Sequence, residues 1–138
     1  MTLAPTSQGN ATQSFTAEAG GTIAIGCGVK FKAATTNTVE LSGAGDDGCG
    51  VASATPVAGA TATTAYASGD AVSVQRGQVL VRSGAAFAAG AELTTDAAGK
   101  FITRTAATEG EWGQAAQVAG GADEYVLAYI NPSAALNN

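Results

Sequence analysis

Two pairs of side chains in this sequence are of types that bind metal ions or form covalent links. Asp46 and Asp47 are adjacent in the segment 43–50, GAGDDGCG, and Cys27 and Cys49 each stand between two glycines. Calcium takes about six to eight oxygen ligands, and calcium loops supply several carboxylates at alternating positions. Because this segment offers two adjacent carboxylates, we interpret it as a solvated turn and predict no metal site.

The two cysteines allow two interpretations. A disulfide between Cys27 and Cys49 requires Cα atoms within about 7 Å, and it would stabilise the fold by roughly 3 kcal/mol. A reducing cytoplasm opposes this bond, and two small buried thiols are the alternative. Two cysteines without histidine are also too few for a structural zinc site.

The sequence offers little for catalysis. It has no histidine, so a general base would have to be a lysine or carboxylate with a perturbed pKa. We find no paired carboxylates in an apolar setting, and a serine or threonine nucleophile would need an activating base within hydrogen-bond reach. We therefore expect no enzymatic activity, no catalytic residues and no cofactor.

Composition limits the fold and the partners. A chain of 138 residues forms one domain, and its 46% hydrophobic fraction is rich in alanine, with 6% aromatic residues and 19 glycines. Such a chain has a thin core, so we predict an oligomer. The net charge is −5 and the six basic residues are scattered, which argues against nucleic acid as a partner. We also find no apolar run of the roughly 18 residues that a membrane helix needs, and no secretory signal, so we expect synthesis in the cytoplasm.

Short strands separated by glycine turns account for most of the chain. The clearest strand signal is 22–31, where Ile23, Ile25, Cys27, Val29 and Phe31 share one face by period two. The segment 38–42 is a second strand, and the segment around Pro56 is an edge or a turn. The segment 60–66 is a strand of low hydrophobic content. The best helical candidate, 86–91, is too short to matter.

The remaining strands are expected to pair in sequence order. Arg76 and Gly77 would form the turn of a tight hairpin, or lie within a longer loop over 75–78, so that Val72, Val74, Val79 and Val81 share one face. Segments 92–95 and 100–105 would form a hairpin with Gly99 in its turn, and 114–119 would pair with 125–131. These patterns predict an all-β barrel or sandwich over 22–138.

Three further features concern the ends and the aromatic residues. Residues 1–21 are polar and contain Pro5, so we predict an extended arm that becomes ordered on a partner. Phe15 either begins the fold or anchors this arm. Trp112 is either an interface anchor or a core residue, and both alternatives remain open. Tyr125 and Tyr129 share a parity and are expected in the core.

Three glycine- and alanine-rich segments carry a resemblance to a known family. They are GDAVSV (69–74), VLVRSGAAFAAGAEL (79–93) and TTDAAGKF (94–101). They resemble an uncharacterised-domain family encoded beside phage major capsid genes, the small head decoration or cement proteins of tailed bacteriophages. The segment 38–60 is similar to the first half of that family, so the likeness spans roughly residues 20–130. Phe87, where valine is common, and the two cysteines depart from the pattern.

The resemblance implies a structural role on the virion. Family members are small β-rich proteins, commonly trimeric, that sit outside the expanded head and hold neighbouring capsid subunits together. It implies the phage major capsid protein and further copies of the chain, as a homotrimer, as partners. Leu3, Pro5 and Phe15 are the candidate capsid contacts of the arm. The alternative is a virion-displayed module that binds host glycans or serves in adhesion, for which Trp112 would be the candidate contact.

Overall fold

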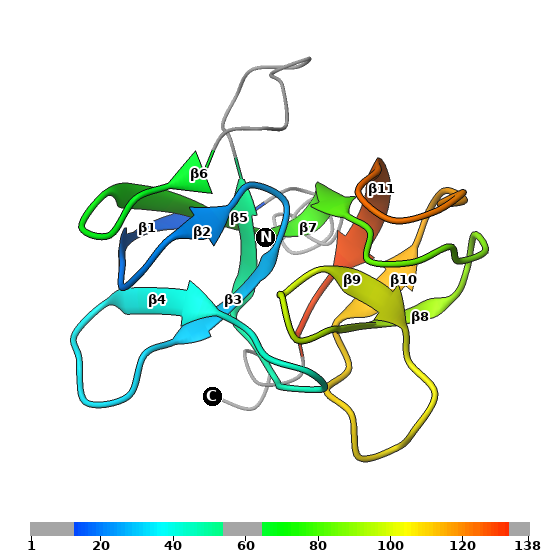
Figure 1. The fold of residues 1–138 in the computed structure, drawn as a ribbon, viewed down its shortest axis with the longest axis horizontal. Coiled ribbons are helices and arrows are strands. Elements are labelled where there is room, and N and C mark those ends of the chain that lie inside the picture. Colours follow the sequence, from blue (N-terminus) through cyan, green and yellow to red (C-terminus); the bar gives the residue numbers. More distant parts are fainter. Residues whose placement is uncertain (1–12, 54–64, 133–138) are drawn as a thin grey trace, which may run out of the picture.

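The computed structural model describes residues 13–53 and 65–132, and within these ranges the chain forms strands but no helix (Figure 1). The predicted all-β class is confirmed, and no helix among these residues is long and apolar enough to cross a membrane. The strands are β1 (Gln13–Ala19), β2 (Ile23–Ala24), β3 (Gly28–Phe31), β4 (Thr38–Leu41), β5 (Gly50–Ser53), β6 (Ala65–Tyr66), β7 (Ala71–Arg82), β8 (Glu92–Thr95), β9 (Phe101–Thr103), β10 (Gly113–Ala115) and β11 (Tyr125–Ile130).

The first part of the chain closes into a barrel, which we call the barrel half. Its strands follow the order β1–β4–β3–β5–β7, and β1 closes the ring by pairing with β7 as well as with β4. The β1–β4 pairing is parallel and the others are antiparallel. Small and β-branched side chains fill its core, which keeps it narrow. They are Ala17, Ala19, Ile23, Val29, Val39, Cys49, Ala52, Val72 and Val74.

The rest of the chain, which we call the C-terminal half, forms a second curled sheet around a larger core. Its strands follow the order β7–β11–β10–β8–β9, and a bridge between Ser83 and Phe101 brings β9 back beside the end of β7. Pairing on both sides leaves few strand edges for unwanted association. Trp112, Phe101, Leu93 and Ile130 are the largest fully buried side chains of this core, and Phe87 is also buried in it.

The two halves share strand β7, which is one continuous strand of 12 residues. The hairpin predicted around Arg76 and Gly77 is therefore wrong, as is the longer loop over 75–78. Arg76 lies opposite Gln13 of β1, whereas Gly77 lies opposite Ile130 of β11, so β7 changes partner between these two residues. Gly77 has a φ of 91°. This left-handed backbone conformation lets the strand pass from its pairing with β1 to its pairing with β11 without the turn that the sequence predicted.

All four valines of β7 are buried, as predicted, but they line two cores. Val72 and Val74 belong to the barrel core, and Val79 and Val81 belong to the C-terminal core. In an extended strand even and odd positions face opposite sides. The change of parity between residues 74 and 79 thus directs the valines to opposite faces of one strand, whereas a hairpin would have brought them to one face.

The fold begins earlier than residue 22. Residues 13–19 form β1, in which Ala17 and Ala19 are buried and six residues pair with β7. The arm predicted for 1–21 is therefore wrong for its last part, because alternating alanines give β1 an inward face that the polar composition concealed. Residues 1–12, including Leu3 and Pro5, lie outside the described residues.

The strand predicted over 22–31 is interrupted. Ile23 and Ala24 form β2, which pairs with β6, and the chain turns at Gly26, with a φ of 89°, before β3 begins. Ile23, Ile25, Cys27 and Val29 are buried as predicted, but Phe31 is 53% exposed because it lies at the end of β3.

Several local predictions are confirmed. The strand predicted over 38–42 is β4, and β8 and β9 form the expected hairpin, with Gly99 at a φ of 80°. Strands β10 and β11 pair as predicted. Pro56 and most of the strand predicted over 60–66 lie outside the described residues.

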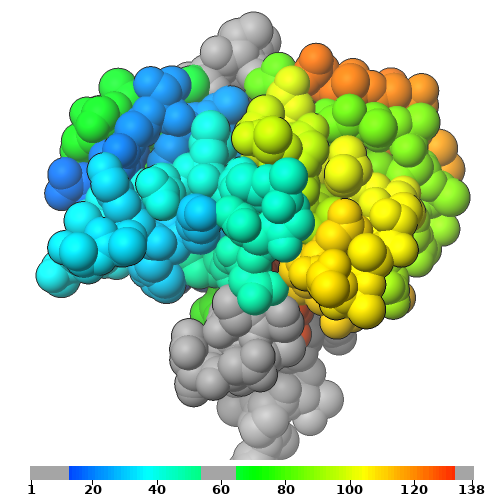
Figure 2. Space-filling view, turned by 60° about the horizontal axis from the view of Figure 1, so that its bottom comes forward, coloured from blue at the N-terminus to red at the C-terminus, as the bar shows by residue number. Residues whose placement is uncertain are grey.

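Two loops join the halves along one seam. Segment 43–50 lies beside the loop between β9 and β10 (Figure 2), where the Gly110 amide donates to the Gly45 carbonyl at 2.8 Å. The Gly45 amide in turn donates to the Thr95 carbonyl, and the Thr95 hydroxyl donates to the Gly43 carbonyl, each at 2.9 Å. The glycine-rich segment, predicted as a solvated turn, thus packs between the two halves.

Candidate functional site

Trp112 is completely buried and contributes to the core. Its indole Nε1–H donates to the Asp46 carbonyl at 2.9 Å, and Phe101 packs edge to face at a ring-centroid distance of 5.3 Å. Gly28 and Gly48 lie so close to the indole that a Cβ at either position would overlap it. The core alternative for Trp112 is correct, and the interface-anchor alternative is wrong. The residue that would have served glycan binding is therefore inaccessible.

The Asp46 carboxylate has structural partners. It accepts hydrogen bonds from Lys30 Nζ at 2.7 Å and from the Gly43 amide at 2.9 Å. The hydrogen bond from Lys30 lowers the pKa of Asp46, the Gly43 amide adds to this effect, and the same ion pair raises the pKa of Lys30. No group of three or more His, Cys, Asp or Glu side chains among the described residues could hold a metal ion. Asp46 thus orders the segment that carries the hydrogen-bond acceptor of Trp112.

Cys27 and Cys49 are free, buried thiols. Of the two alternatives, the structure therefore has the buried thiols, and the proposed disulfide between Cys27 and Cys49 is absent. Burial raises the pKa of Cys27 to about 11 and that of Cys49 to about 12. A thiol with so high a pKa is protonated near neutral pH, and it is a poor nucleophile and metal ligand.

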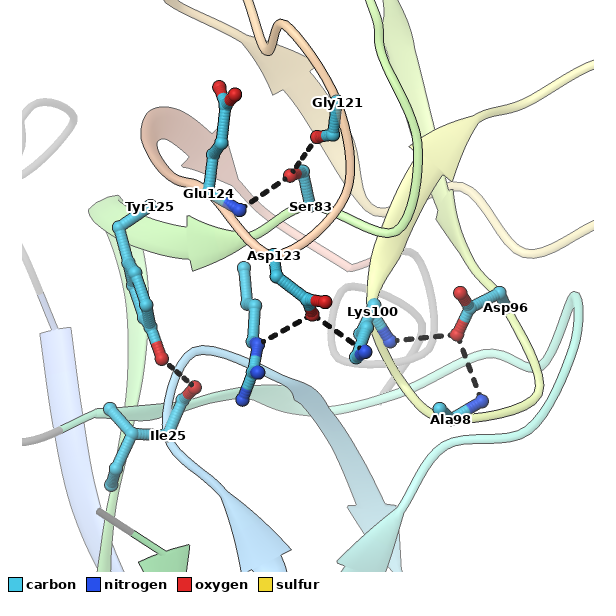
Figure 3. Close-up of polar contacts among 10 residues, drawn as sticks. Ile25, Ser83, Asp96, Ala98, Lys100, Gly121, Asp123, Glu124 and Tyr125 are labelled. Atoms are coloured by element: carbon cyan, nitrogen blue, oxygen red, sulfur yellow. Dashed lines mark hydrogen bonds and ion pairs between the residues drawn. The ribbon is translucent and has the colours of Figure 1, made fainter. Parts of the chain in front are cut away.

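A polar cluster joins the end of β7 to two turns at one end of the C-terminal half (Figure 3). The Asp123 carboxylate contacts Lys100 Nζ at 2.7 Å and Arg82 Nε at 3.1 Å. The hydrogen bond from Lys100 is the main cause that lowers the pKa of Asp123. Asp96 accepts hydrogen bonds from the amides of Ala98 and Lys100, which orders the turn that carries Lys100. One carboxylate therefore joins the end of β7 to two turns.

The same end of the molecule connects to the barrel half. The Tyr125 hydroxyl donates to the Ile25 carbonyl at 3.0 Å, and the Arg82 amide donates to the Gly26 carbonyl at 2.8 Å. A Cβ at Gly26 would lie 2.8 Å from the Tyr125 ring, so this approach requires glycine. Ser83 is buried, and its hydroxyl donates to the Gly121 carbonyl and accepts from the Glu124 amide. These contacts fix the relative position of the two halves.

Large apolar side chains are exposed at four described positions: Phe31, Leu80, Val118 and Tyr129. Phe15 of β1 is half-buried and stacks on Phe31 with ring centroids 5.8 Å apart, so Phe15 belongs to the fold. The expectation that Tyr129 lies in the core is wrong, because it faces outward and is 52% exposed, while Tyr125 is half-buried. Exposed apolar side chains on strands are candidates for contacts with other proteins.

Sequence reasoning missed Leu80 as a surface residue. It stands between Val79 and Val81, which the sequence analysis predicts to share one face. The signal was available, because in an alternating strand with Val79 and Val81 inside, Leu80 must face outward. For Phe31, the period-two pattern gave the opposite indication, and only the end of β3 places it at the surface.

Comparison with known proteins gives a structural relation only. No protein-family model matches this sequence, and no curated protein matches it. Among solved structures, the chain is similar to the head fiber gp8.5 N base of bacteriophage phi29, with a TM-score of 0.56 and 18% sequence identity. The match covers 88% of this chain and 95% of that chain. The two proteins therefore share a fold over nearly their whole lengths.

Proposed function

We propose that this chain is a structural protein of a phage head, bound to the outer surface as a decoration subunit. The observation that carries the proposal is the fold shared with a head fiber base over 88% of the chain. The finer assignment as a decoration subunit comes from the resemblance of residues 38–60 and 69–101 to head decoration proteins, and no family model matches the chain.

The proposed mechanism is mechanical. A decoration subunit stabilises an expanded shell when it contacts several capsid subunits at once, and a trimer adds effective concentration because three equivalent contacts are linked. Closed sheets, the Asp123 cluster and the close glycine packing around Trp112 suit a module that must keep its shape under load. Capsid contact by Leu3, Pro5 and Phe15 belongs to this proposal, as does assembly into a homotrimer.

The ionisable groups support a role without catalysis. Burial raises the pKa of both cysteines, which are therefore protonated near neutral pH, and hydrogen bonds lower the pKa of Asp46, Glu109 and Asp123, which are therefore anions. A carboxylate with a lowered pKa is a weak general base, and a protonated buried thiol is a weak nucleophile. Each of these three carboxylates instead accepts hydrogen bonds within the fold.

The direct test is binding to expanded heads that lack this protein, prepared from the phage that encodes it. We expect added protein to appear as density on the outer surface in electron cryomicroscopy, and to raise the temperature at which the heads release their DNA. Heads that show no added density at saturating protein would contradict the proposal. Density without greater heat resistance would support attachment and contradict the stabilising role.

The contact residues are tested by two variants. Removal of residues 1–12, which takes away Leu3 and Pro5, and the substitution Phe15→Ala, which takes away an aromatic side chain, are each expected to weaken head binding at least about tenfold, since a few residues commonly supply most of the binding energy of a contact. Thr16→Ala is the matched control, because Thr16 is exposed on the same strand and its hydrogen bond from Asn37 uses the backbone carbonyl. Equal binding by all variants would show that the capsid contact lies elsewhere.

A further inference from the structure

One surface of the C-terminal half combines regular strands with exposed apolar side chains. We call it the β7–β11 face, and it consists of Gln78, Leu80, Gln114, Leu127 and Tyr129. Leu80 lies opposite Leu127, and Tyr129 lies between Gln78 and Gln114 on the two neighbouring strands. Opposite residues point to the same side of a sheet. Because Val79, Val81 and Ala128 face the core, these five side chains face outward together.

Leu80 and Tyr129 are diagonal neighbours on this face, and each is 52% exposed. They are two of the four large apolar side chains exposed among the described residues. β11 is paired on both sides, so the exposure belongs to the centre of a sheet rather than to a loop. Apolar side chains that a rigid sheet holds exposed to water favour binding to another protein surface, because binding removes them from water.

The distribution of charge around the β7–β11 face indicates which kind of protein surface can bind it. None of the five side chains is charged, although the chain carries a net charge of −5. Two charged residues on the strands of this sheet form ion pairs: Arg82, at the end of β7, with Asp123, and Glu92, opposite Gln114, with Arg104. Copies of an acidic protein repel one another, and this repulsion is weakest where carboxylates are absent or neutralised. Glutamine and tyrosine both donate and accept hydrogen bonds, so the face can complement itself.

We propose that the β7–β11 face is the contact between copies of this chain, with Leu80 and Tyr129 at its centre. This inference deepens the proposed function, since it assigns the surface through which the decoration subunits would assemble. It also adds to the burial that a chain with a lean core obtains on folding, because association removes from water apolar area that the monomer leaves exposed.

The test is the native mass of the full chain in solution without heads, measured over a range of concentrations. The wild type is expected at a multiple of 13.4 kDa. Leu80→Glu and Tyr129→Glu each place a like charge in the contact, and each should raise the concentration for half-association by about tenfold or more. Phe31→Glu is the matched control, because it adds the same charge at a residue 53% exposed on the barrel half, and its mass should equal that of the wild type.

Circular dichroism and thermal unfolding establish that each variant is folded before its mass is interpreted. A monomeric wild type overturns the proposal, as does an oligomer that Leu80→Glu and Tyr129→Glu leave intact. A monomer whose head binding is lost in Leu80→Glu would instead assign the face to the capsid. Failure of the proposed function gives a different result. If the wild-type oligomer binds no heads, but Leu80→Glu and Tyr129→Glu each dissociate it, the contact between copies is upheld and the decoration role is contradicted.

Discussion

At the scale of residues, glycine decides where the largest side chain fits. Trp112 reaches the Asp46 carbonyl because Gly28 and Gly48 leave the space that its ring occupies. The sequence shows one tryptophan between glycine-rich segments, but it does not show that residues 48 and 112 meet. Whether these two residues, far apart in the sequence, come into contact depends on the fold of the whole chain.

Trp112→Phe is expected to lower the free energy of unfolding by roughly 1–3 kcal/mol, because it removes the Nε1–H donor and leaves the Asp46 carbonyl unpaired in a buried place. Urea unfolding followed by circular dichroism at fixed protein concentration measures this change. Val118→Ala is the control, because Val118 is 64% exposed and its truncation should change stability by less than about 0.5 kcal/mol. Similar midpoints for both variants would contradict the assigned role of Trp112.

The buried thiols make stability depend on alkaline pH. Folding raises the pKa of Cys27 to about 11 and of Cys49 to about 12, from an ordinary 9.0. Their contribution to stability is therefore complete below pH 9, and it is lost as the pH rises from 9 through these values. Each thiol should contribute a decline of up to about 1.4 kcal/mol per pH unit.

Urea midpoints between pH 8 and 11 test this dependence. The double variant Cys27→Ala, Cys49→Ala should show a shallower decline than the wild type, since the tyrosines and lysines titrate in both proteins. Parallel curves for the two proteins would refute the assignment of the alkaline decline to the thiols.

At the scale of elements, β7 is the strand on which the two halves depend. Its alternating valines predicted strands on both sides of Gly77, and this was correct. The hairpin was wrong because glycine beside a polar residue is typical of a turn, while the same φ above zero also fits an irregular position inside a strand. Only the pairing of β7 with β1 and β11 distinguishes these alternatives.

Gly77→Ala is expected to destabilise the fold by roughly 1–2 kcal/mol, since a side chain at a φ of 91° adopts the left-handed region at a cost. Gly21→Ala is the matched control, because a Cβ there meets no atom within 4 Å and its φ lies outside that region. Its stability should be unchanged or slightly raised. Equal unfolding midpoints for Gly77→Ala and the wild type would show that β7 tolerates a side chain at this position.

At the scale of the whole molecule, two small cores are held together by polar contacts at one end and by the 43–50 segment along the seam. Asp123 joins Arg82 and Lys100, and the amide of Arg82 reaches the barrel half at Gly26. This arrangement gives one domain from two cores, of which the barrel core holds small and β-branched side chains and the C-terminal core holds most of the large ones. The prediction of a lean core was made from composition, but its division into two was not.

The Asp123 cluster predicts a dependence of stability on acidic pH. Because folding lowers the pKa of Asp123, its contribution is present above the ordinary value of 3.8 and is lost as the pH falls through the folded value. Asp123→Asn should therefore melt a few degrees below the wild type at pH 7, and the two should converge below pH 3.8. Thermal unfolding from pH 7 to 2.5 measures this, with Glu111→Gln, a change at an exposed carboxylate, as the control. A difference between wild type and Asp123→Asn that is constant with pH would contradict the ion-pair mechanism.

The all-β class, the β8–β9 hairpin and the β10–β11 pair could be predicted from the amino-acid pattern alone, because alternation and turn glycines are local signals. The same pattern also predicted that the four valines of β7 are buried. The three-dimensional fold was needed to establish which core each valine enters, that β1 closes the barrel, that Trp112 is internal and that Leu80 and Tyr129 share an outer face. These features depend on contacts between residues distant in the chain, and such contacts are set by strand register and closure rather than by local pattern.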